Sequence, residues 1–169
     1  MLAFFFTFSC VEIPKGIQPV KNFKLEKYLG TWYEIARLDH RFERGLENIS
    51  ASYSRLGIDG VRVLNKGFDT KKRKWKTAEG KAYFIGSSNE GSLKVSFFGP
   101  FYGGYHIIDL DEAYSRVMIC GPNKEYLWIL SREPTLALSE LEILTKKAKK
   151  LGFDVDNLIY VDHEPKTPK

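Results

Sequence analysis

Between residues 30 and 132, short runs rich in β-branched and aromatic residues recur, separated by clusters of turn-forming residues. The gaps between these runs are too short for helices that would cross over to a parallel neighbour, so consecutive runs should pair as antiparallel hairpins. The predicted strands cover residues 31–38, 49–56, 61–66, 75–85, 92–98, 105–110, 115–120 and 126–131. Eight such strands predict an all-β fold, an antiparallel up-and-down barrel. The interior of an eight-stranded barrel is either filled with side chains or holds one small ligand, and the pattern leaves both open.

One amphipathic helix is predicted after the last strand, which is apolar on both faces and needs cover on its outer side. Ser139 and Glu142 form the S-x-x-E pattern of a capping box. Leu138 and Ile143 take the hydrophobic staple positions around that cap. Apolar residues then recur at helical spacing, at Leu141, Leu144, Ala148 and Leu151. The pattern predicts a helix over about 139–151, packed outside the barrel.

The N-terminal residues form a separate piece. Residues 1–9 are apolar, too short to span a membrane, and typical of the apolar part of a secretory signal. Ser9 directly before Cys10 resembles the cleavage site of bacterial lipoproteins, in which signal removal leaves a cysteine that carries lipid. This resemblance implies that Cys10 is a lipid attachment site and that residues 10–20 tether the anchor to the domain. The alternative is an apolar chain end with a chance cysteine.

The rest of the chain is predicted as one domain, because 169 residues suffice for a single well-packed core. The barrel domain covers residues 21–163 and includes a ninth short strand at 158–161. Residues 164–169 are predicted as a loose tail. No run of 18 or more apolar residues occurs, which excludes a membrane-spanning helix.

Charge and reactive residues give no sign of catalysis or of nucleic-acid binding. The net charge of +5 is mild, and one basic run, from Lys71 to Lys74 together with Lys76, predicts a solvated hairpin tip. The alternative for this run is contact with lipid headgroups. The three histidines are isolated, and no metal-binding, nucleophile or phosphate-loop pattern occurs. Cys120 lies in a predicted strand and is expected to be a buried structural thiol.

Three short motifs carry a family resemblance. GTWY at 30–33 opens the first strand, LDEAY at 110–114 forms an acidic turn, and Arg132 follows the last strand. In this order and spacing they resemble the three signatures of the lipocalins. The stretches GTWYEIAR, DHRFERG and VSFFGPFYGGY, which begin at residues 30, 39 and 95, are similar to bacterial outer-membrane lipocalins of the branch that includes apolipoprotein D.

The resemblance implies a lipid-binding lipoprotein that stores or transports fatty acids or lysophospholipids at the bacterial outer membrane, with a role in envelope maintenance under stress. It implies binding without catalysis or a cofactor, a membrane contact through the anchor on Cys10, and a homodimer. In lipocalins the arginine lies across the tryptophan, so Gly30, Trp32 and Arg132 are expected to form the floor of the barrel rather than to bind ligand. Two alternatives remain: an enzyme built on the barrel, with Cys120 as its reactive group, and a structural surface protein with a filled barrel.

Strand alternation points to the cavity wall. If Arg132 lies inside the floor, residues two, four and six positions before it share its face, and Trp128 among them is the best candidate for the wall. Tyr53 and Phe84 are further ligand-binding candidates on parity alone.

An aromatic, glycine-rich segment adds Phe101 and Tyr102 as ligand-binding candidates. A Gly-Pro pair at 99–100 and a Gly-Gly pair at 103–104 are expected to break the strand here and form a loop or bulge at the barrel rim. Such a rim predicts an entrance that grips an acyl chain. The alternative is a packed loop with ordinary core aromatics.

Overall fold

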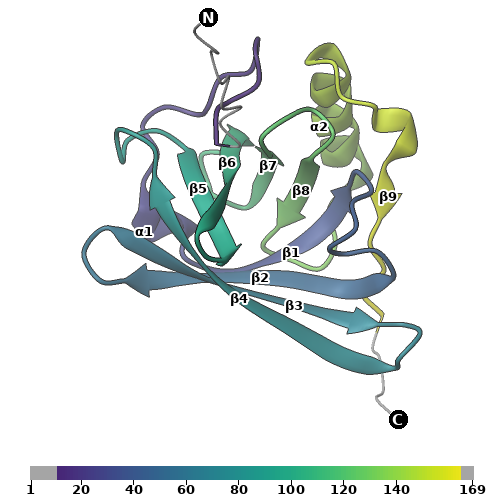
Figure 1. Ribbon diagram of the computed structural model, residues 1–169. Helices are drawn as coiled ribbons and strands as arrows, with labels where there is room; N and C mark the ends of the chain where they lie inside the picture. The colour runs from purple at the N-terminus through teal and green to yellow at the C-terminus, as the bar shows by residue number, and fades with distance from the viewer. Residues whose placement is uncertain (1–10, 165–169) are drawn as a thin grey trace, which may run out of the picture.

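The computed structural model describes residues 11–164, and Figure 1 shows its strands wrapped around a common interior with one long helix beside them. The strands are β1 (Gly30–Arg37), β2 (Leu46–Leu56), β3 (Gly60–Asp69), β4 (Lys74–Phe84), β5 (Ser92–Phe98), β6 (Phe101–Leu110), β7 (Arg116–Cys120), β8 (Leu127–Ser131) and β9 (Ile159–Tyr160). The helices are α1 (Leu25–Tyr28), α2 (Leu138–Lys150) and the short 3₁₀ helix η1 (Val155–Asn157).

Strands β1 to β8 form one closed antiparallel sheet. Each strand pairs with the next along the chain, and β1 also pairs with β8, so the first and last strands leave no open edge. The predicted eight-stranded up-and-down barrel is therefore confirmed. The predicted ninth strand is a two-residue addition to the end of β1, where Ala36 faces Tyr160 and Arg37 faces Ile159.

The two ends of the barrel carry different connections. We call the end at which β1 begins the floor end and the opposite end the mouth end. Because successive strands run in opposite directions, α1 and the β2–β3, β4–β5 and β6–β7 turns lie at the floor end. The 38–45 loop and the β3–β4, β5–β6 and β7–β8 turns lie at the mouth end.

Buried side chains form two clusters, one on each side of the barrel wall. The inner cluster includes Trp32 and Ile119. The outer cluster contains Ile129 of β8 together with Leu144 and Ala148 of α2, and both α2 residues are fully buried. Helix α2 therefore covers the outer side of the barrel, as predicted (Figure 1). None of the helices within residues 11–164 has the length and apolar character needed to cross a membrane.

The predicted capping of α2 is wrong. The helix begins at Leu138, its N-cap is Ala137, and no side chain caps it. Leu138 and Ile143 are exposed, so the predicted staple does not form either. Ser139 lies inside the first turn because the burial of Leu144 and Ala148 sets the position of the helix, and this packing outweighs a capping preference of about 1 kcal/mol.

Strand β6 begins at Phe101, four residues earlier than predicted, and runs through the Gly-Gly pair. Gly103 pairs with Val95 and Gly104 with Lys94, so these glycines do not break the strand. The pairing instead shifts register between Val95 and Phe98. Gly104 allows a close approach: a Cβ there would lie 2.6 Å from His106 Nε2 and 3.3 Å from the carbonyl oxygen of Val11. A missing side chain can thus serve close packing within a strand.

The described part of the predicted tether packs against the barrel. Ile17 is buried in the outer cluster. The main-chain N–H of Val20 donates to the carbonyl oxygen of Ile107 at 2.8 Å, and the N–H of Gly91 donates to the carbonyl oxygen of Val20 at 2.9 Å. Residues 11–20 therefore lie packed on the barrel instead of extending into water as a solvated linker, because Ile17 gains free energy by burial. That this segment tethers an anchor stays a prediction.

Candidate functional site: a cavity inside the barrel

The floor end of the barrel is closed by Trp32 and Arg132. Trp32 is fully buried, and its Nε1 donates a hydrogen bond to the carbonyl oxygen of Tyr28 at 2.8 Å. The Arg132 guanidinium lies 4.0 Å from the centroid of the Trp32 ring, which is a cation–π contact. The same guanidinium donates to the carbonyl oxygens of Thr31 and Leu29, each at 2.9 Å. The contact that the family resemblance implies is therefore present, and it ties α1 to the end of β8.

Gly30 lets this arginine reach its partners. Its φ is +98°, and a Cβ built on it would lie 3.2 Å from Arg132 Nη1. A side chain here would be strained by the backbone and would crowd the guanidinium.

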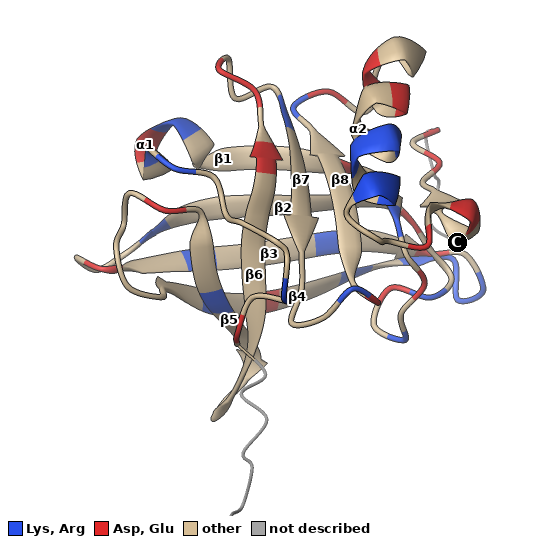
Figure 2. Cartoon of the chain, turned by 90° about the horizontal axis from the view of Figure 1, so that it is seen from above, with Lys and Arg blue, Asp and Glu red and all other residues tan. Residues whose placement is uncertain are grey.

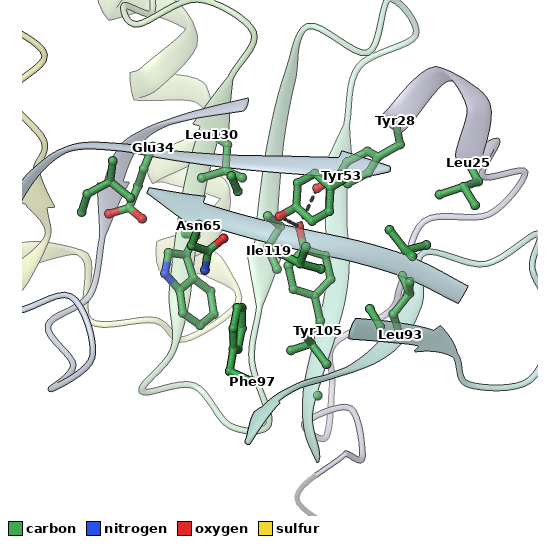
Figure 3. A pocket seen from close by; sticks show the side chains of 18 of the residues that line it. Leu25, Tyr28, Glu34, Tyr53, Asn65, Leu93, Phe97, Tyr105, Ile119 and Leu130 are labelled. Carbon is green, nitrogen blue, oxygen red and sulfur yellow. Dashed lines mark hydrogen bonds between the residues drawn. The ribbon is translucent and has the colours of Figure 1, made fainter. Parts of the chain in front are cut away.

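Above the floor the barrel encloses a cavity of about 120 Å³. Its body is apolar and draws on most strands of the barrel and on the segment before β1 (Figure 3). The apolar lining consists of Phe23, Leu25, Ile49, Ala51, Val61, Val63, Ala82, Leu93, Val95, Phe97, Ile119 and Leu130. A filled barrel would leave no such space, and an apolar cavity of this order can hold a small apolar group without water.

Three tyrosines line one part of the cavity and bond to one another. The hydroxyl of Tyr105 lies 2.6 Å from that of Tyr28 and 2.8 Å from that of Tyr53 (Figure 3). Burial raises the pKa of Tyr53 to about 12 and raises the pKa values of Tyr28 and Tyr105 well above their ordinary value. All three therefore stay neutral at physiological pH, with their hydroxyls paired to one another, so the ring carbons suit an apolar ligand.

A second part of the lining is acidic. Glu34 Oε1 accepts a hydrogen bond from Arg37 Nη1 at 2.9 Å, and both side chains are buried. Glu43, from the 38–45 loop at the mouth end, accepts a hydrogen bond from Trp128 Nε1 at 3.1 Å. Nε2 of His40 lies 2.8 Å from the same carboxylate oxygen of Glu43. The loop therefore brings a second carboxylate into the barrel beside Glu34.

The two carboxyls have opposite pKa shifts. Burial raises the pKa of Glu34 well above its ordinary value, the charge of Glu43 raises it further, and Arg37 opposes both effects. Burial alone would raise the pKa of Glu43 too, but its contacts with His40 and Trp128 outweigh burial and leave that pKa lowered. Glu43 is therefore the carboxyl of this pair that ionises first as the pH rises.

Asn65 of β3 adds an unsatisfied acceptor to the same cavity. Its Oδ1 is buried and accepts no hydrogen bond from the described residues. No Lys or Arg is among the described residues that line the cavity. This lining therefore offers hydrogen-bond acceptors to a ligand, and the charge of the buried Arg37 beside it is already engaged by Glu34 and Glu43.

The predicted ligand-binding residues fall into two groups. Trp128 and Tyr53 line the cavity, and Phe84, Phe101 and Tyr102 lie outside its lining. Phe84 packs against the inner cluster, with its ring 6.1 Å from that of Phe23. Tyr102 lies beside Lys94, whose Nζ is 5.2 Å from the ring centroid, and Phe101 is largely exposed. Contact of any of the five with a ligand stays a prediction.

Several residues that line the cavity were not predicted from the sequence. Glu34 shares a strand face with Trp32, so the parity argument used for Trp128 would have found it. Glu43 comes from a loop, and Tyr28 from a helix too short to predict, so no periodic signal marks them. Phe97 also lines the cavity, although it is not among the ligand-binding candidates predicted from the sequence.

The reactive residues lie elsewhere. Cys120 is fully buried, does not line the cavity, and burial raises its pKa to about 12, which describes an inert thiol rather than a nucleophile. No group of His, Cys, Asp and Glu among residues 11–164 could hold a metal ion. Cys10 lies outside the described residues.

Comparison with known proteins identifies relatives over most of the chain. The family model of a lipocalin-like domain matches residues 23–163. Outer membrane lipoprotein Blc of Vibrio cholerae is 51% identical over 157 residues, which are 92% of each chain. The protein of the same name from Escherichia coli K12 is 51% identical over 148 residues, 88% of this chain and 84% of the relative. Mouse apolipoprotein D is 31% identical over 150 residues, 84% of this chain and 78% of the relative.

The fold has counterparts among solved structures. Insecticyanin from the tobacco hornworm Manduca sexta superposes with a TM-score of 0.72 at 20% identity, and the match covers 91% of this chain and 88% of insecticyanin.

Proposed function

This chain belongs to the lipocalin family, and from that premise we propose that its barrel reversibly binds the acyl chain of a single-chain lipid. The chain is an outer-membrane lipoprotein of the branch whose relatives carry that name. The observation that carries the proposal is the apolar cavity above the Trp32–Arg132 floor. Each methylene moved from water into such a space contributes about 0.8 kcal/mol, so binding needs no specific polar contact and no bond chemistry.

The acidic part of the lining favours a lysophospholipid over a free fatty acid. A fatty acid would bring its carboxylate, directly attached to the chain, next to Glu34 and Glu43, where the buried Arg37 is already paired with Glu34 at 2.9 Å and lies 3.9 Å from Glu43. In a lysophospholipid the group next to the chain is a neutral ester with a nearby hydroxyl, which can donate to Asn65 Oδ1 or to a carboxylate. Its phosphate then lies further out, towards the mouth end.

Native mass spectrometry of the delipidated protein tests the binding proposal. We expect a one-to-one adduct with lysophospholipid that a fluorescent acyl probe displaces. Trp128→Ala should weaken the adduct, because Trp128 forms part of the wall. The matched control is Trp75→Ala, since Trp75 packs on Phe68 outside the cavity lining. A well-folded protein without any adduct would contradict the proposal and favour the structural-protein alternative.

Displacement of the same probe tests the head-group preference. At equal chain length, we expect lysophosphatidylcholine to compete at about tenfold lower concentration than the fatty acid. Glu43→Gln removes the charge but keeps the shape, so it should reduce the difference between the concentrations at which lysophosphatidylcholine and the fatty acid displace the probe. A fatty acid that competes equally well in the unsubstituted protein would contradict the preference.

The proposed function also includes a lipid anchor on Cys10, a homodimer and ligand binding without catalysis. We expect mass spectrometry of protein extracted from membranes to find lipid on Cys10 at a new N-terminus, whereas a chain that still begins at Met1 would contradict it. Native mass spectra also report whether the homodimer forms.

Cys120→Ser should leave ligand binding unchanged, because Cys120 does not line the cavity.

A further inference from the structure

The charges of the hairpin turns differ between the two ends of the barrel. The three floor-end turns, residues 57–59, 85–91 and 111–115, contain Asp59, Glu90, Asp111 and Glu112 and no Lys or Arg, and Glu90 pairs with Lys21 from the segment before α1. In the mouth-end β3–β4 turn, Lys71, Lys72 and Arg73 are followed by Lys74, and all four are exposed. Figure 2 shows the acidic turn beyond the head of the β6 arrow in red.

Asp69 does not cancel this positive charge. Its carboxylate accepts hydrogen bonds from the main-chain N–H groups of Lys71 and Lys72 and pairs with Lys76 Nζ at 2.7 Å. The carboxylate therefore shapes the turn that presents the four basic side chains, and its charge is already matched by a fifth cation.

The mouth end also exposes three phenylalanine rings. Phe98 and Phe101 flank the β5–β6 turn and are 73% and 78% exposed, and Phe42 in the 38–45 loop is 61% exposed. The β5–β6 hairpin carries no charged residue from 95 to 105. Large apolar side chains gathered at the uncharged tip of a hairpin are costly in water and typical of a surface that meets another apolar phase.

The described chain begins beside this hairpin. The carbonyl oxygen of Val11 lies 3.3 Å from the position that a Cβ of Gly104 would take, and Gly104 is three residues from Phe101 in β6. Cys10 is the next residue, and one peptide unit spans about 3.8 Å. A lipid attached at Cys10 would therefore hold the β5–β6 hairpin next to the bilayer, because residues 11–20 are packed on the barrel rather than free.

From these observations we propose that the mouth end docks on the surface of an anionic bilayer. The Phe42, Phe98 and Phe101 rings enter the headgroup region, and the basic β3–β4 turn contacts lipid phosphates. Both the cations and the rings contribute to such binding, and the cationic part is sensitive to salt. The mouth then opens towards the leaflet, so an acyl chain can pass between bilayer and cavity without crossing water. The docking proposal rests on the proposed lipid binding, because docking matters only if the cavity takes up lipid. Docking itself can be measured without any lipid in the cavity.

Vesicle flotation of the full chain with Cys10→Ala tests the docking without the anchor. The probes are phosphatidylcholine vesicles with and without phosphatidylglycerol. We expect binding only to the anionic vesicles and its loss at high salt. The variant Lys71→Ser/Lys72→Ser should lower the binding constant by about tenfold or more, and Phe42→Ser/Phe98→Ser should lower it on the same vesicles.

The matched control is Lys24→Ser/Lys27→Ser, which removes cations at the floor end, at α1. We expect it to bind vesicles as the unsubstituted protein does. Equal loss in the control and the β3–β4 variant would show a dependence on net charge alone and overturn the proposal, as would salt-independent binding. Residues 1–9 are identical in all these proteins, so their own affinity for lipid cancels in the comparison.

Binding of the acyl probe in solution distinguishes a failure of the docking proposal from a failure of the proposed function. The β3–β4 variant should still bind the acyl probe in solution, because none of its substituted residues lines the cavity. Vesicle binding without probe binding would contradict the cavity proposal and leave docking supported. Probe binding without any vesicle binding in the unsubstituted protein would overturn the docking proposal alone.

Discussion

Arg132 holds together segments of the chain that are far apart in the sequence. Its guanidinium covers Trp32, and its two terminal nitrogens donate to main-chain carbonyls of α1 and of the residues after it. A lysine at this position would keep the charge but lose the planar array of donors.

We therefore expect Arg132→Lys to lower the free energy of unfolding by about 2 kcal/mol, because several main-chain carbonyl oxygens, some of them partly buried, lose their donors and Trp32 loses its planar cover. Urea titration measures the change. The control is Arg62→Lys, since Arg62 forms an exposed pair with Glu79 at 3.4 Å, and such pairs contribute little. Equal, small effects in both variants would show that the floor does not depend on the guanidinium geometry.

Asp69 predicts a pH-dependent contribution to stability. The hydrogen bond from Lys76, followed by the main-chain N–H of Lys72, lowers the pKa of Asp69 from 3.8 to about 2. The folded state therefore favours the ionised form, so the stabilisation is complete above about pH 4 and is lost as the pH falls through 2. Asp69→Asn should be less stable than the unsubstituted protein at pH 6, and the difference should shrink towards pH 2. Urea titrations at several pH values check this, and a difference that stays constant with pH would contradict it.

At the scale of elements, α2 shows packing overriding a local signal. Ser139 makes no capping hydrogen bond, whereas Leu144 is fully buried between the helix and the barrel. We expect Ser139→Ala to change the free energy of unfolding by less than about 0.5 kcal/mol. Leu144→Ala should cost about 2–5 kcal/mol, because it leaves a cavity in the outer cluster. Thermal or urea unfolding distinguishes the two variants. A large decrease in the free energy of unfolding of Ser139→Ala would indicate that Ser139 caps the helix after all.

The 38–45 loop and residues 11–20 are the elements that give this barrel its particular site. The loop brings Glu43 into the cavity, where Trp128 binds it, and the N-terminal segment fixes where Val11 lies on β6. Both have irregular backbones, and both are positioned by contacts with residues distant in the sequence.

For the whole molecule, ligand binding and folding should be linked. A lipid that binds only the closed barrel stabilises it in proportion to the logarithm of its concentration, by about 2.7 kcal/mol at one hundred times its Kd. For a domain of this size, such a gain raises Tm by roughly 5–10 °C. Scanning calorimetry with increasing lysophospholipid measures the shift, and Trp128→Ala should need more lipid for the same rise. A Tm that does not change while the adduct forms would mean that the lipid binds the unfolded chain equally well.

The order of the strands, the closed barrel and the outer helix were predictable from the sequence pattern, whereas the Trp32–Arg132 floor was implied by the resemblance to lipocalins. Hairpin spacing and the alternation of apolar residues are local properties that leave a chain of this length few ways to bury its core. Parity within single strands likewise placed Trp128 and Tyr53 on the cavity wall, and it would have placed Glu34 there.

Only the tertiary structure decided which loop and terminal residues complete the site. Glu43, Tyr28 and Val11 take their places through long-range contacts, and the sequence around them has no period that could show it. The same holds for Phe101: its residue type suggested a ligand contact, but its exposure follows from where the β5–β6 hairpin ends. Local patterns determine strands and faces, because burial of a face depends on spacing along the chain. The position of a loop depends on what the rest of the fold leaves for it to pack against.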